Sequence, residues 1–352
     1  MRTSLKVLCG LCILISLVMS LELFSALTCD EDEEYCIAWP EALLPNGFKM
    51  DGKPVEAPQD CVDRVEQCAY FLANGECKLN PGWMIVNCPV SCNSCHLRDS
   101  KVRCRRESLN ISNSIAFSNP GSMENMFASL KKRLDNKFGA VNVLSTSPWV
   151  ITVDDFVSND EAHDLITGIT TWERSTDAGE MNEFGESGRT LTYGRTSSNS
   201  WCRGSCERRP TIQGLAAKIS QYIQVPVKNY EAFQVLRYEV GQQYVVHHDF
   251  SHHQLGLACG PRIMTVLLYL SHVEEGGETV FPELGITIKP KKGRAVFFPD
   301  VQVDDLNVAD MRIVHRAKPV LKGQKYAVNT WVHLYDFKKP NLWGCTGLFD
   351  VL

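Results

Sequence analysis

Six cysteines crowd into residues 61–95, and they limit what this stretch of the chain can fold into. A segment of this length cannot bury enough apolar surface to be stable by itself, so crosslinks or a metal must stabilise it. Cys92 and Cys95 have the spacing of zinc ligands, but such a density of cysteines is typical of disulfide frameworks in oxidising compartments. The sequence alone does not choose among the pairings that six cysteines allow.

The first residues of the chain favour disulfides over zinc. Two basic residues precede an apolar run from Val7 to Leu21, and an acidic cluster follows, which is the pattern of a secretory signal. We expect residues 1–27 to be a signal peptide or, if they are not cleaved, a membrane anchor. Asn110 begins an Asn-Ile-Ser triplet, an N-glycosylation acceptor that agrees with a secretory route.

The cysteine cluster resembles the ShKT (sea-anemone toxin-like) module. The resemblance covers all six cysteines, the "NGEC" block at Asn74–Cys77 and the ending "CPVSCNSC". It implies three disulfides, Cys61–Cys95, Cys68–Cys88 and Cys77–Cys92. Because most of the chain lies outside this module, we expect it to be a small stabilising or docking unit attached to a larger domain.

The rest of the chain divides by composition. Residues 28–60 are acidic and then Pro-rich, so we expect a linker there, pinned by a Cys29–Cys36 bridge. Residues 96–147 are polar and basic, and we expect a second linker with one helix, because apolar residues recur at helical spacing at Met123, Met126, Phe127, Leu130 and Leu134. Residues 148–338 begin with a strand and a helix that has a Ser/Asn capping position at Ser158 and Asn159, and many short apolar strands follow. This pattern predicts a mainly β sandwich or jelly roll with a helical front, and residues 339–352 then form a C-terminal tail.

A histidine-rich segment lies inside the β region. Residues 244–250 are rich in β-branched and aromatic residues and predict a strand, in which side chains alternate between two faces. His247 and Asp249 therefore point one way, and His248 points the other way. One imidazole and one carboxylate on the same face supply two of the three ligands of a 2-His-1-carboxylate triad, which suits non-haem Fe(II).

Two later residues complete this predicted site. His315 is the candidate for the third metal ligand. Lys325 follows ten residues later and is the candidate for anchoring the far carboxylate of a dicarboxylic acid. A His-x-Asp pair alone is a weak signal, so the hypothesis depends on the combination of these residues.

That combination resembles the Fe(II)/2-oxoglutarate dioxygenases and, within them, the prolyl 4-hydroxylases. The likeness covers about residues 148–338 and includes the blocks "RTSSNSW", "YEVGQQYVVHHDF", "GGETVFP" and "HRAKPVLKGQKYAVNTWVH". It implies a double-stranded β-helix (jelly roll) as the catalytic domain. One departure is the "CRGSC" block at Cys202–Cys206 in the expected substrate loop, where a local bridge would stiffen the loop.

The resemblance also implies a role for individual residues. The implied iron ligands are His247, Asp249 and His315. The implied 2-oxoglutarate contacts are Lys325, Tyr238 and Thr279. The implied peptide-groove residues are Tyr244, Arg262 and Trp331.

The implied activity is hydroxylation of peptidyl proline at C4 in proteins of the secretory pathway, in the lumen or at the membrane of the endoplasmic reticulum. It is coupled to the decarboxylation of 2-oxoglutarate to succinate and CO2, with O2 as oxidant and L-ascorbate as reductant of the iron. The implied partners are proline-rich or collagen-like peptides, and a net charge of −5 argues against a nucleic-acid partner.

Two other classes of function compete with this one. One is another 2-oxoglutarate-dependent peptidyl hydroxylase, for example one acting on lysine, although the "GGETVFP" block favours proline. The other is a non-catalytic secreted binding protein that uses the ShKT module. Four intact residues, His247, Asp249, His315 and Lys325, argue against the second alternative, because a protein without the chemistry has no chemical reason to keep all of them.

Overall fold

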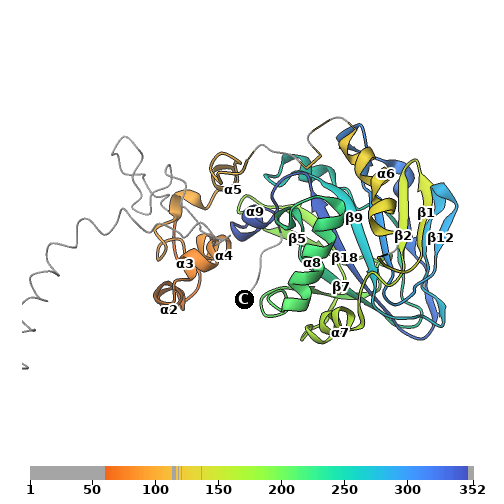
Figure 1. Cartoon of the computed structure of the whole chain (residues 1–352). Helices are drawn as coiled ribbons and strands as arrows, with labels where there is room; N and C mark the ends of the chain where they lie inside the picture. Colours follow the sequence, from red (N-terminus) through yellow and green to blue (C-terminus); the bar gives the residue numbers. More distant parts are fainter. Residues whose placement is uncertain (1–59, 113–115, 118, 120, 136, 348–352) are drawn as a thin grey trace, which may run out of the picture. The chain divides into compact units, whose positions relative to one another are not determined.

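The structure is a computed structural model that describes residues 60–112, 116–117, 119, 121–135 and 137–347 (Figure 1). The expected signal or anchor over residues 1–27, nearly all of the first linker and the Cys29–Cys36 bridge lie outside the described residues. Among the helices of the described part, none has the length and apolar character needed to span a membrane.

Residues 60–95 form a small module of short helices, which are α2 (Cys68–Ala73), α3 (Glu76–Leu79) and α4 (Pro81–Asn87). Its three disulfides are the pairs that the resemblance implies, Cys61–Cys95, Cys68–Cys88 and Cys77–Cys92. The hydrophobic cluster of the module is small: Cys68, Met84 and Cys88 are buried, and five partly buried hydrophobic residues pack against them. Crosslinks therefore stabilise the module more than hydrophobic burial does.

Reduction of these bridges is expected to unfold the module while the large sheet stays folded. Losing a native bridge from a small secreted domain typically costs about 2–5 kcal/mol, which a core of this size cannot offset. Mass spectrometry of the denatured, unreduced protein should find only Cys259 alkylated among the described cysteines, since it alone is free. Alkylation of Cys61 or Cys95 in that sample would contradict the disulfide framework.

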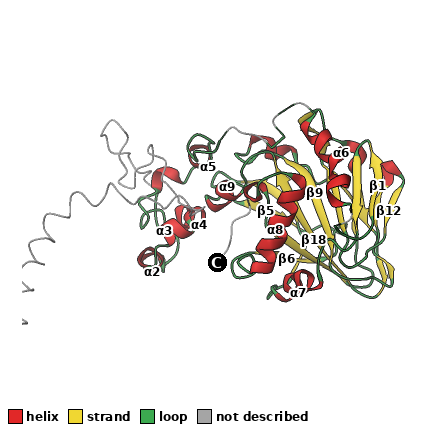
Figure 2. Cartoon of the chain, in the orientation of Figure 1, coloured by secondary structure: helices red, strands yellow, loops and turns green. Residues whose placement is uncertain are grey.

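After residue 121 the chain forms two main antiparallel sheets and three two-stranded sheets, with helices on one side (Figures 1 and 2). The larger sheet has the strand order β1-β2-β13-β9-β18-β7-β6-β3, and the smaller has the order β12-β11-β16-β8. The strands are β1 (Val141–Thr146), β2 (Trp149–Val153), β3 (Glu173–Arg174), β4 (Asp177–Met181), β5 (Ser187–Thr190), β6 (Ser198–Cys202), β7 (Phe233–Tyr238), β8 (Tyr244–His247), β9 (Arg262–Tyr269), β10 (Glu275–Gly276), β11 (Thr279–Phe281), β12 (Ile286–Ile288), β13 (Ala295–Pro299), β14 (Val301–Gln302), β15 (Asp305–Ala309), β16 (His315–Ala317), β17 (Val320–Lys322) and β18 (Lys325–His333). This is the predicted jelly roll.

The remaining helices are α5 (Ser100–Arg103), α6 (Ser122–Leu134), α7 (Asn159–Thr167), α8 (Pro210–Ile223) and α9 (Lys338–Leu342). The predicted capping position is confirmed for α7: the Ser158 side chain accepts from the Glu161 backbone N–H, and the Glu161 carboxylate accepts from the Ser158 backbone N–H. Helix α8, which has Pro210 in its first turn, was not predicted from the sequence.

Side chains alternate strictly between the two faces of the central strands, so each face of the larger sheet contributes to a different hydrophobic cluster. In β9, Val266 and Leu268 belong to the large hydrophobic core that α6, α7 and α8 cover. Leu267 and Tyr269 belong to a second cluster, which also contains Phe281 of the smaller sheet. The strands of the larger sheet therefore present every second side chain to the space between the two sheets, and the candidate site lies on that side.

Two expected boundaries are wrong. The second linker, expected over residues 96–147, ends in α6 and β1: α6 is buried in the large core, and β1 pairs with β2. The tail expected over residues 339–352 begins inside α9, and Cys345 forms a disulfide with Cys104. Both segments were misjudged because their partners lie far away in the sequence.

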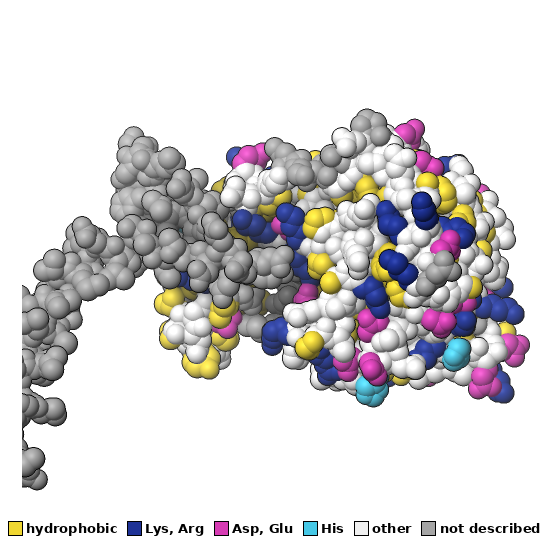
Figure 3. Space-filling model, in the orientation of Figure 1, with side chains coloured by type: hydrophobic (Ala, Val, Ile, Leu, Met, Phe, Trp, Pro, Cys, Tyr) yellow, Lys and Arg dark blue, Asp and Glu magenta, His cyan; other side chains and the backbone are white. Residues whose placement is uncertain are grey.

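The surface is consistent with the modest net charge of the chain. On the face drawn in Figure 3, basic and acidic side chains lie interspersed over the sheet domain. Asn110, the predicted glycosylation acceptor, is exposed.

Candidate metal centre and active site

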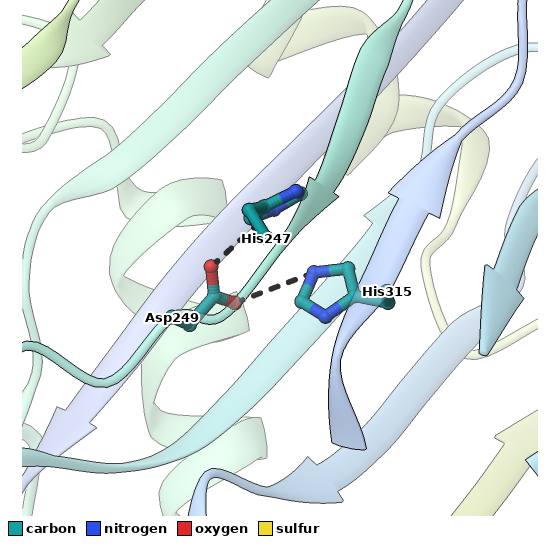
Figure 4. A group of neighbouring side chains, drawn as sticks. All are labelled: His247, Asp249 and His315. Atoms are coloured by element: carbon teal, nitrogen blue, oxygen red, sulfur yellow. Dashed lines mark ion pairs between the residues drawn. The ribbon is translucent and has the colours of Figure 1, made fainter. Parts of the chain in front are cut away.

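Three side chains from the smaller sheet converge on one point (Figure 4). His247 is the last residue of β8, Asp249 follows two residues later, and His315 opens β16 directly opposite His247 in the sheet register. The Nε2 atoms of both histidines lie 3.7 Å from the Asp249 carboxylate, one from each oxygen. One ligand atom from each residue falls within 4.8 Å of the others, as a shared metal ion requires.

The strand that carries the motif is shorter than predicted, because β8 ends at His247 and does not reach Phe250. The predicted separation of side chains nevertheless holds. His248 is turned away from the site: its Nδ1 accepts from the Phe250 backbone N–H at 2.9 Å, and its Nε2 donates to the Asp310 carbonyl at 3.1 Å. The protein therefore brings together His247, Asp249 and His315 and leaves His248 outside.

The protonation of the two histidines fits a metal ion. Each Nδ1 lies at hydrogen-bond distance from a backbone carbonyl, that of Val245 at 2.8 Å and that of Ile313 at 3.2 Å, so Nδ1 carries the proton and Nε2 presents a lone pair. Burial and the neighbouring His315 lower the pKa of His247 to about 3, which keeps its imidazole neutral. Two neutral imidazoles and one carboxylate suit Fe(II) with coordination positions left for substrates.

A second carboxyl group supports Asp249 through a hydroxyl. The Thr265 hydroxyl lies 2.8 Å from Asp249 Oδ2 and 2.9 Å from Asp300 Oδ2. It has one proton, so if it donates to Asp249 it accepts from a protonated Asp300. Burial and the charge of Asp249 raise the pKa of Asp300 well above its usual value, which agrees with this arrangement. Burial opposes ionisation of Asp249 too, but positive charge on the facing His315 and His247, and the permanent charge of Arg262, lower its pKa overall.

Lys325 lies at the start of β18, deep in the protein. Its side chain is 2% exposed and donates one hydrogen bond, to the Gly277 carbonyl at 2.8 Å. The rings of Tyr238 and Tyr269 lie 5.0 and 5.5 Å from the ammonium, and the Tyr269 hydroxyl donates to Thr279 at 2.7 Å. Among the described residues no carboxylate lies within ion-pair distance, and burial lowers the pKa of Lys325 to about 7. A buried cation of this kind favours binding of an anion.

The three expected peptide-groove residues surround the triad. The Tyr244 ring stacks on His247 with 3.6 Å between ring centroids. The Arg262 guanidinium lies 3.8 Å from the centre of the Trp331 ring. Trp331 is 4% exposed, so it lies beneath Arg262 rather than on an open surface. Its indole N–H faces the Asp249 carboxylate and helps to lower the pKa of that group.

An ionic cluster that the sequence analysis missed fixes Arg262. Glu231 is buried and accepts from Arg262 Nε at 2.6 Å and from His333 Nε2 at 2.8 Å. His333 Nδ1 also donates, to the Gly260 carbonyl, so both ring nitrogens carry protons. Burial alone would lower the pKa of His333, but Cys259 and Glu231 raise it to about 10. The cluster therefore stays charged at neutral pH.

A jelly roll with this triad and a buried lysine is the arrangement of an Fe(II)- and 2-oxoglutarate-dependent oxygenase. The sequence model of the 2OG-Fe(II) oxygenase superfamily matches residues 233–333, and that of ShK domain-like proteins matches residues 60–95. Prolyl 4-hydroxylase 2 from Arabidopsis thaliana is 35% identical over 221 residues, covering 56% of this chain and 72% of that protein. Prolyl 4-hydroxylase 5 from the same plant is 32% identical over 223 residues, with coverages of 56% and 72%.

Solved structures were matched over about half of the chain. A viral collagen prolyl hydroxylase from Paramecium Bursaria Chlorella virus-1, in complex with 2OG, is 27% identical, covers 52% of this chain and 95% of that chain, and has a TM-score of 0.40. The superfamily match and the triad confirm the class: this protein is an enzyme that uses Fe(II) and 2-oxoglutarate. The chain belongs to the prolyl 4-hydroxylase family.

Proposed function

We propose that this enzyme hydroxylates proline at C4 in extended, proline-rich peptides of the secretory pathway and converts 2-oxoglutarate to succinate and CO2. The observation that carries the proposal is the pairing of the His247, Asp249 and His315 cluster with the buried, unpaired ammonium of Lys325. His247, Asp249 and His315 hold the iron, and Lys325 binds the far carboxylate of 2-oxoglutarate. Tyr238, whose ring lies 5.0 Å from the Lys325 ammonium, and Thr279, which accepts from the Tyr269 hydroxyl, contact the same cosubstrate.

Bound iron and 2-oxoglutarate supply the oxidising chemistry, and the protein binds and orients the reactants. Asp249 is held by Thr265, so its carboxylate keeps one orientation between the two imidazoles. The ring of Tyr244 covers one side of His247 and limits access of water to that side. These residues hold the metal ligands in place and leave the bond-breaking step to the cofactors.

A buried donor without a partner supports a peptide as the substrate. Arg195 Nε has no hydrogen-bond acceptor among the described residues. Arg195 lies 4.7 Å from the centre of the Tyr244 ring, so it borders the same site. Leaving a buried donor unpaired costs free energy, which the carbonyl groups of a bound peptide would recover. Extended polyproline II peptides expose their carbonyls for this kind of recognition because they make no internal hydrogen bonds.

A peptide panel tests the proposal. Poly-proline, Gly-Pro-Pro repeats and a lysine-containing peptide without proline are incubated with the enzyme, Fe(II), 2-oxoglutarate and ascorbate. We expect succinate release that depends on a proline peptide, with 4-hydroxyproline found by amino-acid analysis of the product. Hydroxylysine from the third peptide, or succinate release that no proline peptide changes, would contradict the proposal. The His247→Ala variant gives the background.

The cellular location follows from the same proposal. Five disulfides among the described residues suggest folding in an oxidising compartment. We propose the endoplasmic reticulum as the place of action, with residues 1–27 as the targeting signal or anchor and Asn110 as a glycosylated residue.

The Cys202–Cys206 bridge lies at the end of β6 and stiffens the loop that follows it.

A further inference from the structure

The tip of a hairpin beside the active site contacts the residues that follow the ShK module. Strands β4 and β5 pair only with each other and belong to neither main sheet. Residues 182–186 form the tip, and the Ser100 backbone N–H donates to the Glu183 carbonyl at 2.9 Å. An isolated two-stranded hairpin is marginally stable in water, so this hairpin depends on contacts such as these.

Arg103 joins the hairpin tip to two other segments. Its fully buried guanidinium donates to the Phe184 carbonyl at 2.7 Å and to the Trp343 carbonyl at 2.8 Å. It also donates to the carbonyls of Leu97 at 2.7 Å, Arg98 at 3.0 Å and Gly344 at 3.1 Å. Backbone carbonyl oxygens thus accept from the donors of this guanidinium. If the hairpin tip or the segment after α9 moved away, the buried charge would lose these hydrogen bonds without gaining water in their place.

The ring of Phe184 provides a second contact, to the module itself. The guanidinium of Arg64, inside the module, lies 4.6 Å from the ring centre, and that of Arg98 lies 5.1 Å from it. The disulfide Cys104–Cys345 ties the same region to the residues after α9. The neighbouring Gly185 has φ +82°, and a side chain there would meet the Gly344 carbonyl, so the close approach requires glycine.

The other end of the hairpin reaches the active site. Asp177, the first residue of β4, accepts a hydrogen bond from the Tyr244 hydroxyl at 3.1 Å and another from Thr192 at 2.9 Å. Arg195 approaches the same carboxylate at 3.6 Å. Tyr244 is the residue that stacks on His247, so a continuous set of contacts runs from the ShK module through the hairpin to the metal centre.

We propose that the ShK module and the segment after it, residues 60–104, act as a clamp that holds hairpin β4–β5 in its peptide-binding position. Arg103 and Phe184 are the positioning residues of this clamp. The inference rests on the proposed function in taking the ligand to be a peptide. A looser hairpin lowers the fraction of enzyme that is ready to bind peptide, and the apparent affinity falls by that fraction. Binding of Fe(II) and 2-oxoglutarate should be unaffected, because their residues lie on the two main sheets or, for Asp249, directly after β8, and none lies on the hairpin.

The test uses the full chain with three substitutions. Phe184→Ala removes the ring, Phe184→Tyr keeps it, and Arg105→Ala removes a nearby exposed arginine whose side chain donates only to the Lys101 carbonyl. Loss of two cation–π contacts predicts a peptide KM about 5- to 30-fold higher for Phe184→Ala. The KM for 2-oxoglutarate and kcat should stay within about twofold of the parent values. Hydrogen exchange of residues 177–190 should be faster in Phe184→Ala and unchanged in the other two variants.

Several outcomes overturn the clamp. The first is that Phe184→Ala keeps the peptide KM and the hydrogen exchange of the parent. The second is that Phe184→Ala loses 2-oxoglutarate binding and peptide binding equally while its hydrogen exchange stays unchanged. Arg103→Ala should produce a larger effect but risks unfolding, so Phe184 carries the test. If the parent enzyme turns over no proline peptide, the proposed function fails, and hydrogen exchange still decides whether the module orders the hairpin.

Discussion

Replacing His247, Asp249 or His315 by alanine is expected to abolish both Fe(II) binding and turnover. The three residues supply the whole set of protein ligands, and among the described residues no fourth His, Cys, Asp or Glu joins their cluster. A site with three protein ligands has none to spare. Iron content after dialysis and succinate release from a proline peptide measure the two losses.

His248→Ala is the matched control, because it removes an adjacent imidazole that faces away from the site. It should keep bound iron and substantial activity. Iron lost in His248→Ala but retained in His247→Ala would show that the two side chains have been assigned to the wrong faces.

Thr265→Val should bind metal about 10- to 100-fold more weakly than the parent, because it loses the hydrogen bond that orients Asp249.

Lys325→Ala is expected to raise the KM for 2-oxoglutarate strongly while iron binding changes little. The ammonium is buried and makes its one hydrogen bond to a neutral carbonyl, so the dicarboxylate supplies its counter-charge. Losing a buried charge-assisted contact costs roughly 2–5 kcal/mol, or about 30- to several-thousand-fold in affinity. Lys322→Ala is the control, since Lys322 is exposed and pairs with Glu274. Equal 2-oxoglutarate dependence in both variants and the parent would rule out Lys325 as the anchor.

The pH dependence of 2-oxoglutarate binding follows from the same residue. Burial lowers the pKa of Lys325 to about 7 in the free protein, although Glu278 opposes the shift. Below that pH the ammonium is present and can bind a carboxylate, and above it the charge is lost. The KM for 2-oxoglutarate should therefore rise by about tenfold per pH unit above 7, and this slope should vanish in Lys325→Ala.

Much of the site was predictable because it is encoded locally. The His-x-Asp spacing, the later histidine and the lysine each stand next to a recognisable strand, and alternation separates His247 from His248. Alternation along β9 could also have found Thr265 and Tyr269, which share the face of Leu267.

The supporting partners were not predictable in this way. Glu231 meets His333 across 102 residues, and Thr265 meets Asp300 across 35, so each pair depends on strand neighbours that one sequence does not reveal. The boundary errors have the same origin. Val141 and Val143 alternate with polar residues as a strand should, but only pairing with β2 assigns β1 to the sheet.

The disulfide between Cys104 and Cys345 sets an order of events during biosynthesis. The two cysteines are 241 positions apart, and chains are made from the N-terminus at about 5–20 residues per second, so Cys104 emerges roughly 10–50 s before its partner. The six cysteines of the ShK module can all pair within 34 positions of one another during that interval. Cys104 must stay reduced meanwhile, and a thiol next to three new disulfides is open to exchange with them. Correct maturation therefore needs a compartment that both oxidises and reshuffles thiols while the chain is still being made.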